Sequence, residues 1–270
     1  MSSLRPNALV PQGTAAPRRH KPWTVFSNTN PQPQRPAGRP IPLTRRYEVT
    51  WIDDDGHLDS FVRIAPALPV FEQAFCAFAH GALVSTTEGP VPVEDVEPGM
   101  VVETVSGGAE RLRWVGAITL VPGAPSAEDA PQKLYRVTAD SFGLGRPASD
   151  VTLGPGARLM NRDPAIRNAL GCEAALAPVT TLADGHGVVE MTPVSPVRVY
   201  HLAFDGHHVI RVGGIEAESF HPGPDAHYSM SRELRETFLS LFPYVATMQG
   251  FGRVLWPRFE EGQDGGYEFV

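Results

Sequence analysis

The chain has 270 residues and a net charge of −7, and 42% of its residues are hydrophobic, which is enough for a sizeable core. Its 27 prolines and 26 glycines favour many turns over a helical fold. Two cysteines exclude a disulfide scaffold, and we expect both to be reduced thiols. No apolar run approaches the roughly 18 residues that span a bilayer. No signal segment is visible at the N-terminus. A cytoplasmic location is therefore favoured, without membrane partners, although the compartment stays unknown.

Residues 1–46 form a basic, proline-rich segment. They hold eight Lys/Arg residues, nine prolines and no acidic residue. Because this segment lacks hydrophobic periodicity, we predict a disordered arm. The other residues carry 15 basic and 30 acidic side chains and would repel phosphates, so nucleic acid could bind only through residues 1–46. The alternative is that the arm is only a solubilising extension.

A β domain is predicted over residues 47–248, and it begins with a hairpin over 47–65. The Asp55-Gly56 step between the two apolar runs supplies the positive φ that a hairpin turn needs. Three successive aspartates, Asp53 to Asp55, also suggest calcium. However, the ligand spacing of an EF-hand loop and its closing glutamate are missing, so we predict a turn and no metal.

The stretch from 75 to 102 shows the clearest β pattern. Ala82, Val84 and Thr86 alternate with their neighbours, and Gly89-Pro90 interrupts the run. Period-two runs cut by Gly and Pro are typical of strands with short connections. The same pattern continues to Glu216–Phe220, so we predict that this stretch begins one all-β domain. Further strands are expected at 112–121, 135–138, 151–153, 188–192, 197–202 and 208–212.

Two short helices complete the prediction. Asp163 as N-cap and Pro164 at the first helical position predict a helix that ends near Gly171. Ser231 is the predicted cap of a helix over 232–242 with an apolar stripe. Residues 249–270 are rich in Gly and Glu and are predicted to form a loose tail. The fold class is therefore all-β, with one or two short peripheral helices and disordered termini.

Several ordered motifs resemble one known family, the Hedgehog/intein (Hint) domain in its stand-alone bacterial form. The motifs are Gly81-Ala82-Leu83-Val84, Gly89, Pro92-Val93-Glu94-Asp95-Val96-x-x-Gly99, Trp114-x-Gly116, Tyr200-His201-Leu202, His207 and Glu218-Ser219-Phe220-His221-Pro222-Gly223. The resemblance covers roughly residues 75–225. It implies a highly twisted β disc in which the ends of the domain approach each other.

The resemblance also implies a chemistry, autoprocessing by an acyl shift. In the family a Cys or Ser at the first position attacks the preceding carbonyl, and a histidine in a T-x-x-H motif assists the proton transfers. Here the nucleophile position holds Ala77, and Ala157 occupies the histidine position of that motif. Glu218-Ser219 stands where inteins carry a terminal His-Asn pair, and only His207 matches a site histidine.

Cys76 lies one residue before the expected nucleophile. Side chains alternate faces along an extended chain, so a slip of one residue points the thiol away from the site. The main hypothesis is a degenerate Hint domain that acts as a scaffold or interaction module for an unknown protein partner. The alternatives are self-cleavage by Cys76 with His207, and a nucleic-acid-binding arm. No cofactor is expected.

Two other enzyme or metal hypotheses receive less support. Histidines gather late in the sequence, and His201, His207 and His221 suggest a metal site, but no cysteine or helical H-x-x-x-H spacing accompanies them. A serine hydrolase is disfavoured because the G-x-S-x-G elbow is missing. We therefore predict no metal site.

Overall fold

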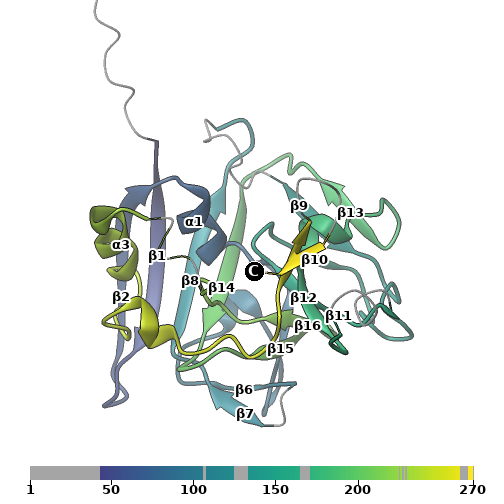
Figure 1. Cartoon of the computed structure of the whole chain (residues 1–270), viewed down its shortest axis with the longest axis horizontal. Coiled ribbons are helices and arrows are strands. Elements are labelled where there is room, and N and C mark those ends of the chain that lie inside the picture. Colours follow the sequence, from purple (N-terminus) through teal and green to yellow (C-terminus); the bar gives the residue numbers. More distant parts are fainter. Residues whose placement is uncertain are drawn as a thin grey trace, which may run out of the picture. The chain divides into compact units, whose positions relative to one another are not determined.

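Two large antiparallel sheets contain most of the strands that the structure describes (Figure 1). The structure, a computed structural model, describes residues 43–105, 108–124, 133–164, 171–224, 226, 228, 230–261 and 267–269. These residues belong to one compact unit, Ile41–Val270. Residues 1–42 of the arm predicted over 1–46, most of the helix predicted after Asp163 and part of the turn at Gly107 lie outside the described residues.

The first sheet has eight strands in the order β13-β9-β10-β3-β14-β8-β1-β2. Its strands are β1 (Thr44–Ile52), β2 (Leu58–Pro66), β3 (Phe78–Ala79), β8 (Trp114–Leu120), β9 (Leu134–Val137), β10 (Val151–Leu153), β13 (Val188–Met191) and β14 (Val197–Ala203). Strand β3 is short but central, because it joins β10 to β14 within this sheet.

The second sheet runs in the order β12-β11-β16-β15-β4-β6-β7, and β5 also pairs with β4. Its strands are β4 (Leu83–Thr86), β5 (Gly89–Pro92), β6 (Val101–Glu103), β7 (Ala109–Arg111), β11 (Arg158–Asn161), β12 (Ala175–Pro178), β15 (Val209–Val212) and β16 (Ile215–Glu218). Val84 and Thr86 are buried whereas Leu83 is exposed, which confirms the predicted alternation. A separate ribbon pairs β17 (Phe259–Glu261) with β18 (Tyr267–Phe269).

Helices are short, as predicted. The described α-helices are α1 (Pro69–Glu72) and α3 (Arg232–Leu239), and the 3₁₀ turns are Gln73–Phe75, Val93–Asp95, Val179–Leu182 and Met248–Phe251. Ser231 caps α3, because its Oγ accepts a hydrogen bond from the Leu234 amide at 3.3 Å. The helix ends earlier than residue 242, since the Phe242 amide bonds to the Leu239 carbonyl three residues back. The all-β class with short helices is confirmed.

Two predicted boundaries were wrong. Strand β1 begins at Thr44, inside the predicted arm, because Arg45 and Arg46 pair with Ala65 and Ile64 across the hairpin. The hairpin is also part of the first sheet, since β1 pairs with β8 from Glu48 to Trp51. At the other end, residues 249–258 are not a loose tail: Phe251 and Arg258 are each only 4% exposed.

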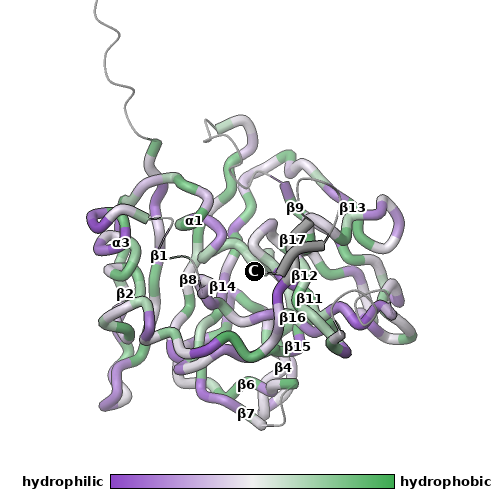
Figure 2. The backbone as a smooth tube through the Cα atoms, viewed as in Figure 1, coloured by the Kyte–Doolittle hydropathy of each residue, from purple (hydrophilic) through white to green (hydrophobic). Residues whose placement is uncertain are grey.

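Two apolar clusters make up most of the core, beside two smaller ones. One contains Ala77, Phe78 and Ala157, and the other contains Cys76, Phe75 and Trp114. Hydrophobic and hydrophilic stretches alternate along the chain (Figure 2). The Trp-x-Gly motif belongs to the second cluster: the indole lies over Gly116, where a Cβ would come within 2.1 Å of the ring. None of the described helices has the length and apolar character that crossing a membrane requires.

Candidate functional site

Cys76 and Ala77 lie where the chain passes from the 3₁₀ turn Gln73–Phe75 into strand β3. Cys76 has φ −130° and ψ 48°, so the chain bends at this residue before it becomes extended. Both side chains are completely buried, but they belong to different apolar clusters. The opposite orientation expected from alternation is therefore present, and the thiol and the Ala77 methyl face different parts of the core.

The Gly154-Pro155-Gly156-Ala157 segment, which aligns with the histidine motif of the family, packs directly on this bend. The Gly154 amide donates to the Ala77 carbonyl at 2.8 Å, and the Gly156 amide donates to the Cys76 carbonyl at 3.0 Å. Both glycines are required by this close approach, since a Cβ on Gly154 would lie 2.0 Å from the Cys76 oxygen. Ala157 is fully buried in the same cluster as Ala77. The two segments that the resemblance singled out are therefore in contact, and the side chains of Ala77 and Ala157 are buried methyl groups.

The Cys76 thiol is in an unreactive environment. Burial raises the pKa of this thiol far above its ordinary value, and it outweighs the Gly156 hydrogen bond and the Arg45 charge, which both lower the pKa. Reactive cysteines need the opposite, a cationic neighbour or a base that favours the thiolate. Among the described residues, no histidine or lysine side chain is hydrogen-bonded to the Cys76 sulfur.

His207, the one family-matching histidine, is held by protein groups on both ring nitrogens. The Leu255 amide donates to Nδ1 at 2.9 Å, so Nε2 carries the proton and donates to Glu218 Oε1 at 2.5 Å. The His207 side chain is completely buried. The ring therefore orients Glu218 and binds the 255 segment, and neither nitrogen is available for proton transfer to a substrate.

Glu218 and Arg258 form a buried ion pair beside His207. Arg258 Nε lies 2.8 Å from Glu218 Oε1, and the Arg258 Nη2 donates to the His221 carbonyl at 2.8 Å. Burial alone would favour the neutral acid, but the Arg258 guanidinium and His207 outweigh it and lower the pKa of Glu218 to about 2. Arg158 Nε lies 3.8 Å from the other carboxylate oxygen. We call Arg158, His207, Glu218 and Arg258 the ionic cluster.

Two further histidines adjoin the ionic cluster. His201 Nδ1 lies 3.3 Å from the Gln73 carbonyl, and burial lowers its pKa to about 4. His221 also has a pKa of about 4, lowered by burial and by Arg258. Its Nδ1 accepts from the Gly223 amide and its Nε2 donates to the Gly252 carbonyl. Because the nitrogens of His207 and His221 have protein partners, the arrangement does not favour the metal site that the late histidines suggested.

A small cavity separates the Cys76 bend from the ionic cluster. Its volume is about 70 Å³, and its lining includes Gln73 and Gly156 on one side and Glu218 and Arg258 on the other. This is room for one or two water-sized molecules. The cavity places polar groups near the Cys76 backbone, although the groups that face it are already paired with one another.

Sequence reasoning missed Arg258 and the role of Glu218. Arg258 was assigned to the tail, and it is 40 residues from its partner, so no local pattern connects the two. Glu218 belongs to a motif that resembles the family and stands where inteins carry a terminal His-Asn pair, but the sequence does not indicate its ion pair. The adjacent Ser219 is completely buried, and its Oγ accepts a hydrogen bond from the His208 amide at 3.0 Å.

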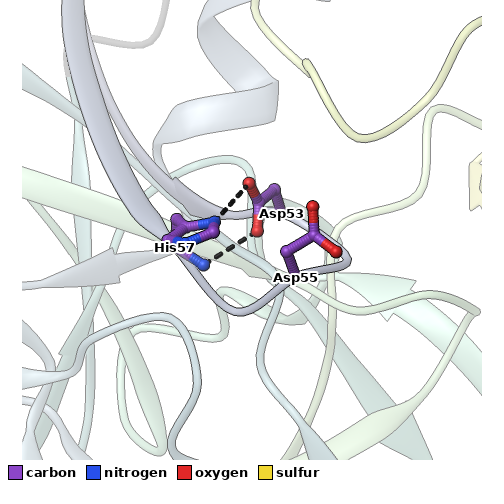
Figure 3. Close-up of side chains that lie close together, drawn as sticks. All are labelled: Asp53, Asp55 and His57. Carbon is purple, nitrogen blue, oxygen red and sulfur yellow. Dashed lines mark hydrogen bonds and ion pairs between the residues drawn. The ribbon is translucent and has the colours of Figure 1, made fainter.

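The aspartate turn of the leading hairpin is the remaining candidate for a metal site. Asp53, Asp55 and His57 bring one ligand atom each within 4.8 Å of one another (Figure 3). Both Asp53 oxygens are engaged by His57, one by its amide at 2.8 Å and one by its ring at 3.2 Å. The amide hydrogen bond from His57 lowers the pKa of Asp53. The geometry is that of a side-chain-capped turn, as the sequence predicted.

Comparison with known proteins identifies the family of this chain. The family model described as "Hint domain" matches residues 76–224, which is more than half of the chain. The protein therefore belongs to the Hint domain family. A solved structure similar to it is the bacterial intein-like domain from Clostridium thermocellum, at 16% identity and a TM-score of 0.35, over 53% of this chain and 97% of that one. No curated protein matches.

Proposed function

We propose that this Hint domain does not process itself and serves as a folded interaction module. The proposal is carried by one observation: the bond that would be cut, Phe75–Cys76, is enclosed in the core, with both side chains completely buried. Phe75 packs edge-on against Trp114 and Tyr47, at centroid distances of 5.0 and 4.8 Å.

The chemistry of an acyl shift explains why enclosure matters. The Cys76 sulfur would attack the Phe75 carbonyl carbon, the C–N bond would break as the amine takes up a proton, and water or a thiol would then cleave the thioester. These steps need a thiolate, a proton donor and access for the second nucleophile. The buried thiol with its raised pKa, and Ala157 at the histidine position, oppose each of them.

The segment before Cys76 is built into the domain, which also opposes its release. Tyr47, Phe71 and Phe75 are fully buried, and Arg45 pairs with the buried Glu72. Strand β1 lies between β2 and β8 inside the first sheet. A cut before Cys76 would leave this upstream segment bound by the same packing that now holds it. An interaction module needs a stable fold, and the packing around Cys76 supplies one without exposing the Phe75–Cys76 bond.

Self-cleavage by Cys76 is the second candidate. It is favoured by the start of the family match at Cys76 and by the polar-lined cavity beside Gly156. A nucleic-acid-binding arm is a separate proposal that rests on the eight basic residues of 1–46 alone. It predicts salt-sensitive binding that is lost when residues 1–42, which precede β1 and hold six of these basic residues, are removed.

The test is the intact mass of the purified full-length protein after long incubation with and without dithiothreitol or hydroxylamine. We expect a single species near 29.2 kDa under every condition. Cys76→Ala is the matched control and should give the same result. A thiol-dependent fragment that begins at Cys76 and disappears in Cys76→Ala would overturn the proposal and establish the second candidate.

A further inference from the structure

Strand β2 is an edge strand whose outer side is unpaired within the described structure. It pairs with β1 along its whole length and ends the order of the first sheet (Figure 1). Bonds between Ala67 and Leu43 and between Asp53 and His57 show that odd-numbered residues face β1. In an antiparallel ladder the alternate residues then point their N–H and C=O groups outward. The outward set is Leu58, Ser60, Val62 and Ile64.

The outer side of β2 lacks most of the usual protection of an edge. Natural edge strands are short or bulged, or they carry lysine or proline. Strand β2 has nine residues, its only proline is Pro66 at the end, and no bulge interrupts its register with β1. Leu58, Val62 and Ile64 are 53%, 50% and 63% exposed. The Ser60 amide, which has no strand partner, bonds to the adjacent Asp59 carboxylate at 2.7 Å.

We propose that β2 pairs with β2 of a second copy of this chain, antiparallel and around a two-fold axis at Phe61. Ser60 would then exchange backbone hydrogen bonds with Val62 of the other copy, and Leu58 with Ile64. Asp59 would lie opposite Arg63 in a non-hydrogen-bonded pair, where side chains approach most closely. The symmetry forms this Asp–Arg pair twice.

Charge complementarity selects this partner and this register. Asp59, Phe61 and Arg63 share one face of the strand, since Arg63 lies over the Phe61 ring at 5.5 Å. Asp59 and Arg63 are exposed and lie at equal distances on either side of Phe61 in the sequence. A register centred on Val62 would instead place Arg63 opposite Phe61 and leave the charges unmatched. The charges of the strand are therefore complementary to those of a second copy. In a two-fold dimer each Asp59 would lie opposite an Arg63 of the other chain.

The inference rests on the proposed function, because it names the partner of the interaction module. The test measures molar mass by sedimentation and light scattering across a range of concentrations. We expect a concentration-dependent dimer of 29.2 kDa chains. Asp59→Arg and Arg63→Asp should each weaken dimerisation at least tenfold by placing like charges opposite each other. The double variant Asp59→Arg/Arg63→Asp should restore it.

A matched pair of lysine substitutions separates the edge from general surface effects. Ile64→Lys should reduce dimerisation, whereas Val194→Lys, at a loop residue 99% exposed, should not. A monomer at all concentrations, or a dimer insensitive to the β2 variants, would overturn the inference. So would failure of the double variant to recover. The intact mass of the same samples tests the proposed function separately. An intact chain that stays monomeric would contradict only the β2 pairing. A cleaved chain would contradict the proposal that the domain does not process itself.

Discussion

The two sides of the small cavity differ in what holds them together. On one side, backbone hydrogen bonds join the Cys76 bend to the 154–157 segment, and the side chains of Ala77 and Ala157 are buried methyl groups. On the other side, the ionic cluster joins the charged side chains of residues 158, 218 and 258 to the His207 ring. The first side is therefore held by backbone contacts and the second by side-chain charges. The buried charge has a structural role, because it fixes the C-terminal segment.

The largest effect is expected from breaking the ionic cluster. Arg258→Ala would leave the Glu218 carboxylate buried without its main partner, which costs about 3–5 kcal/mol for such pairs. We expect a loss of this size in the free energy of unfolding, measured with urea. Arg232→Ala, which removes an exposed pair with Glu236, is the control and should change stability very little. If both variants were equally stable, the cluster would have no structural role.

The pH dependence of stability should come from the same side of the cavity. His201 and His221 have folded pKa values of about 4, below the ordinary 6.5, so the unfolded chain binds more protons between these values. Stability is therefore lost as pH falls from 6.5 through 4, on the order of 2–3 kcal/mol for each histidine. Glu218 adds a further loss between its ordinary value of 4.5 and about 2.

This dependence is measured by urea unfolding from pH 7 to pH 4. His201→Asn should flatten the profile, and His57→Asn, at an exposed turn residue, should leave it unchanged. A free energy of unfolding that stays constant from pH 7 to pH 4.5 would contradict the assignment of neutral, buried rings to these two histidines.

A smaller loss is expected on the apolar side of the cavity. Gly154→Ala places a methyl group 2.0 Å from the Cys76 carbonyl oxygen, so the backbone must shift. Such overpacking costs about 1–3 kcal/mol. Gly108→Ala is the matched control, since a Cβ there meets open space. Equal melting temperatures for the two variants would show that the 154–157 segment does not pack on the bend as described.

The smallest effect concerns thiol reactivity, with no change in stability. Cys76 is buried and Cys172 is half-buried, so a thiol reagent should label Cys172 in the native protein and both cysteines after denaturation. Cys172→Ser should leave almost no fast-reacting thiol. Rapid native labelling of Cys76 would show that the bend opens readily, and it would favour the self-cleaving alternative.

Local patterns predicted much of the fold. The alternation at Val84 and Thr86, the Asp-Gly turn and the Ser231 cap each depend on neighbours a few residues away, and each is present. The assignment of Ala77 and Ala157 to family site positions stays a prediction of the resemblance. Arg258 could not be predicted in this way, because its partner is remote and its surrounding residues have no period. The joining of β1 to β8 is likewise a long-range contact that no short window of sequence contains.

Arg258 also bears on where the folding unit ends. The family match stops at residue 224, and it begins at Cys76, after β1 and β2. A protein trimmed to residues 76–224 would lose the strand that covers β8, the indole partner at Leu241 and the counter-charge of Glu218. The homologous segment is thus smaller than the compact unit, Ile41–Val270, to which it belongs. Domain borders for expression or fusion should enclose at least residues 43–258.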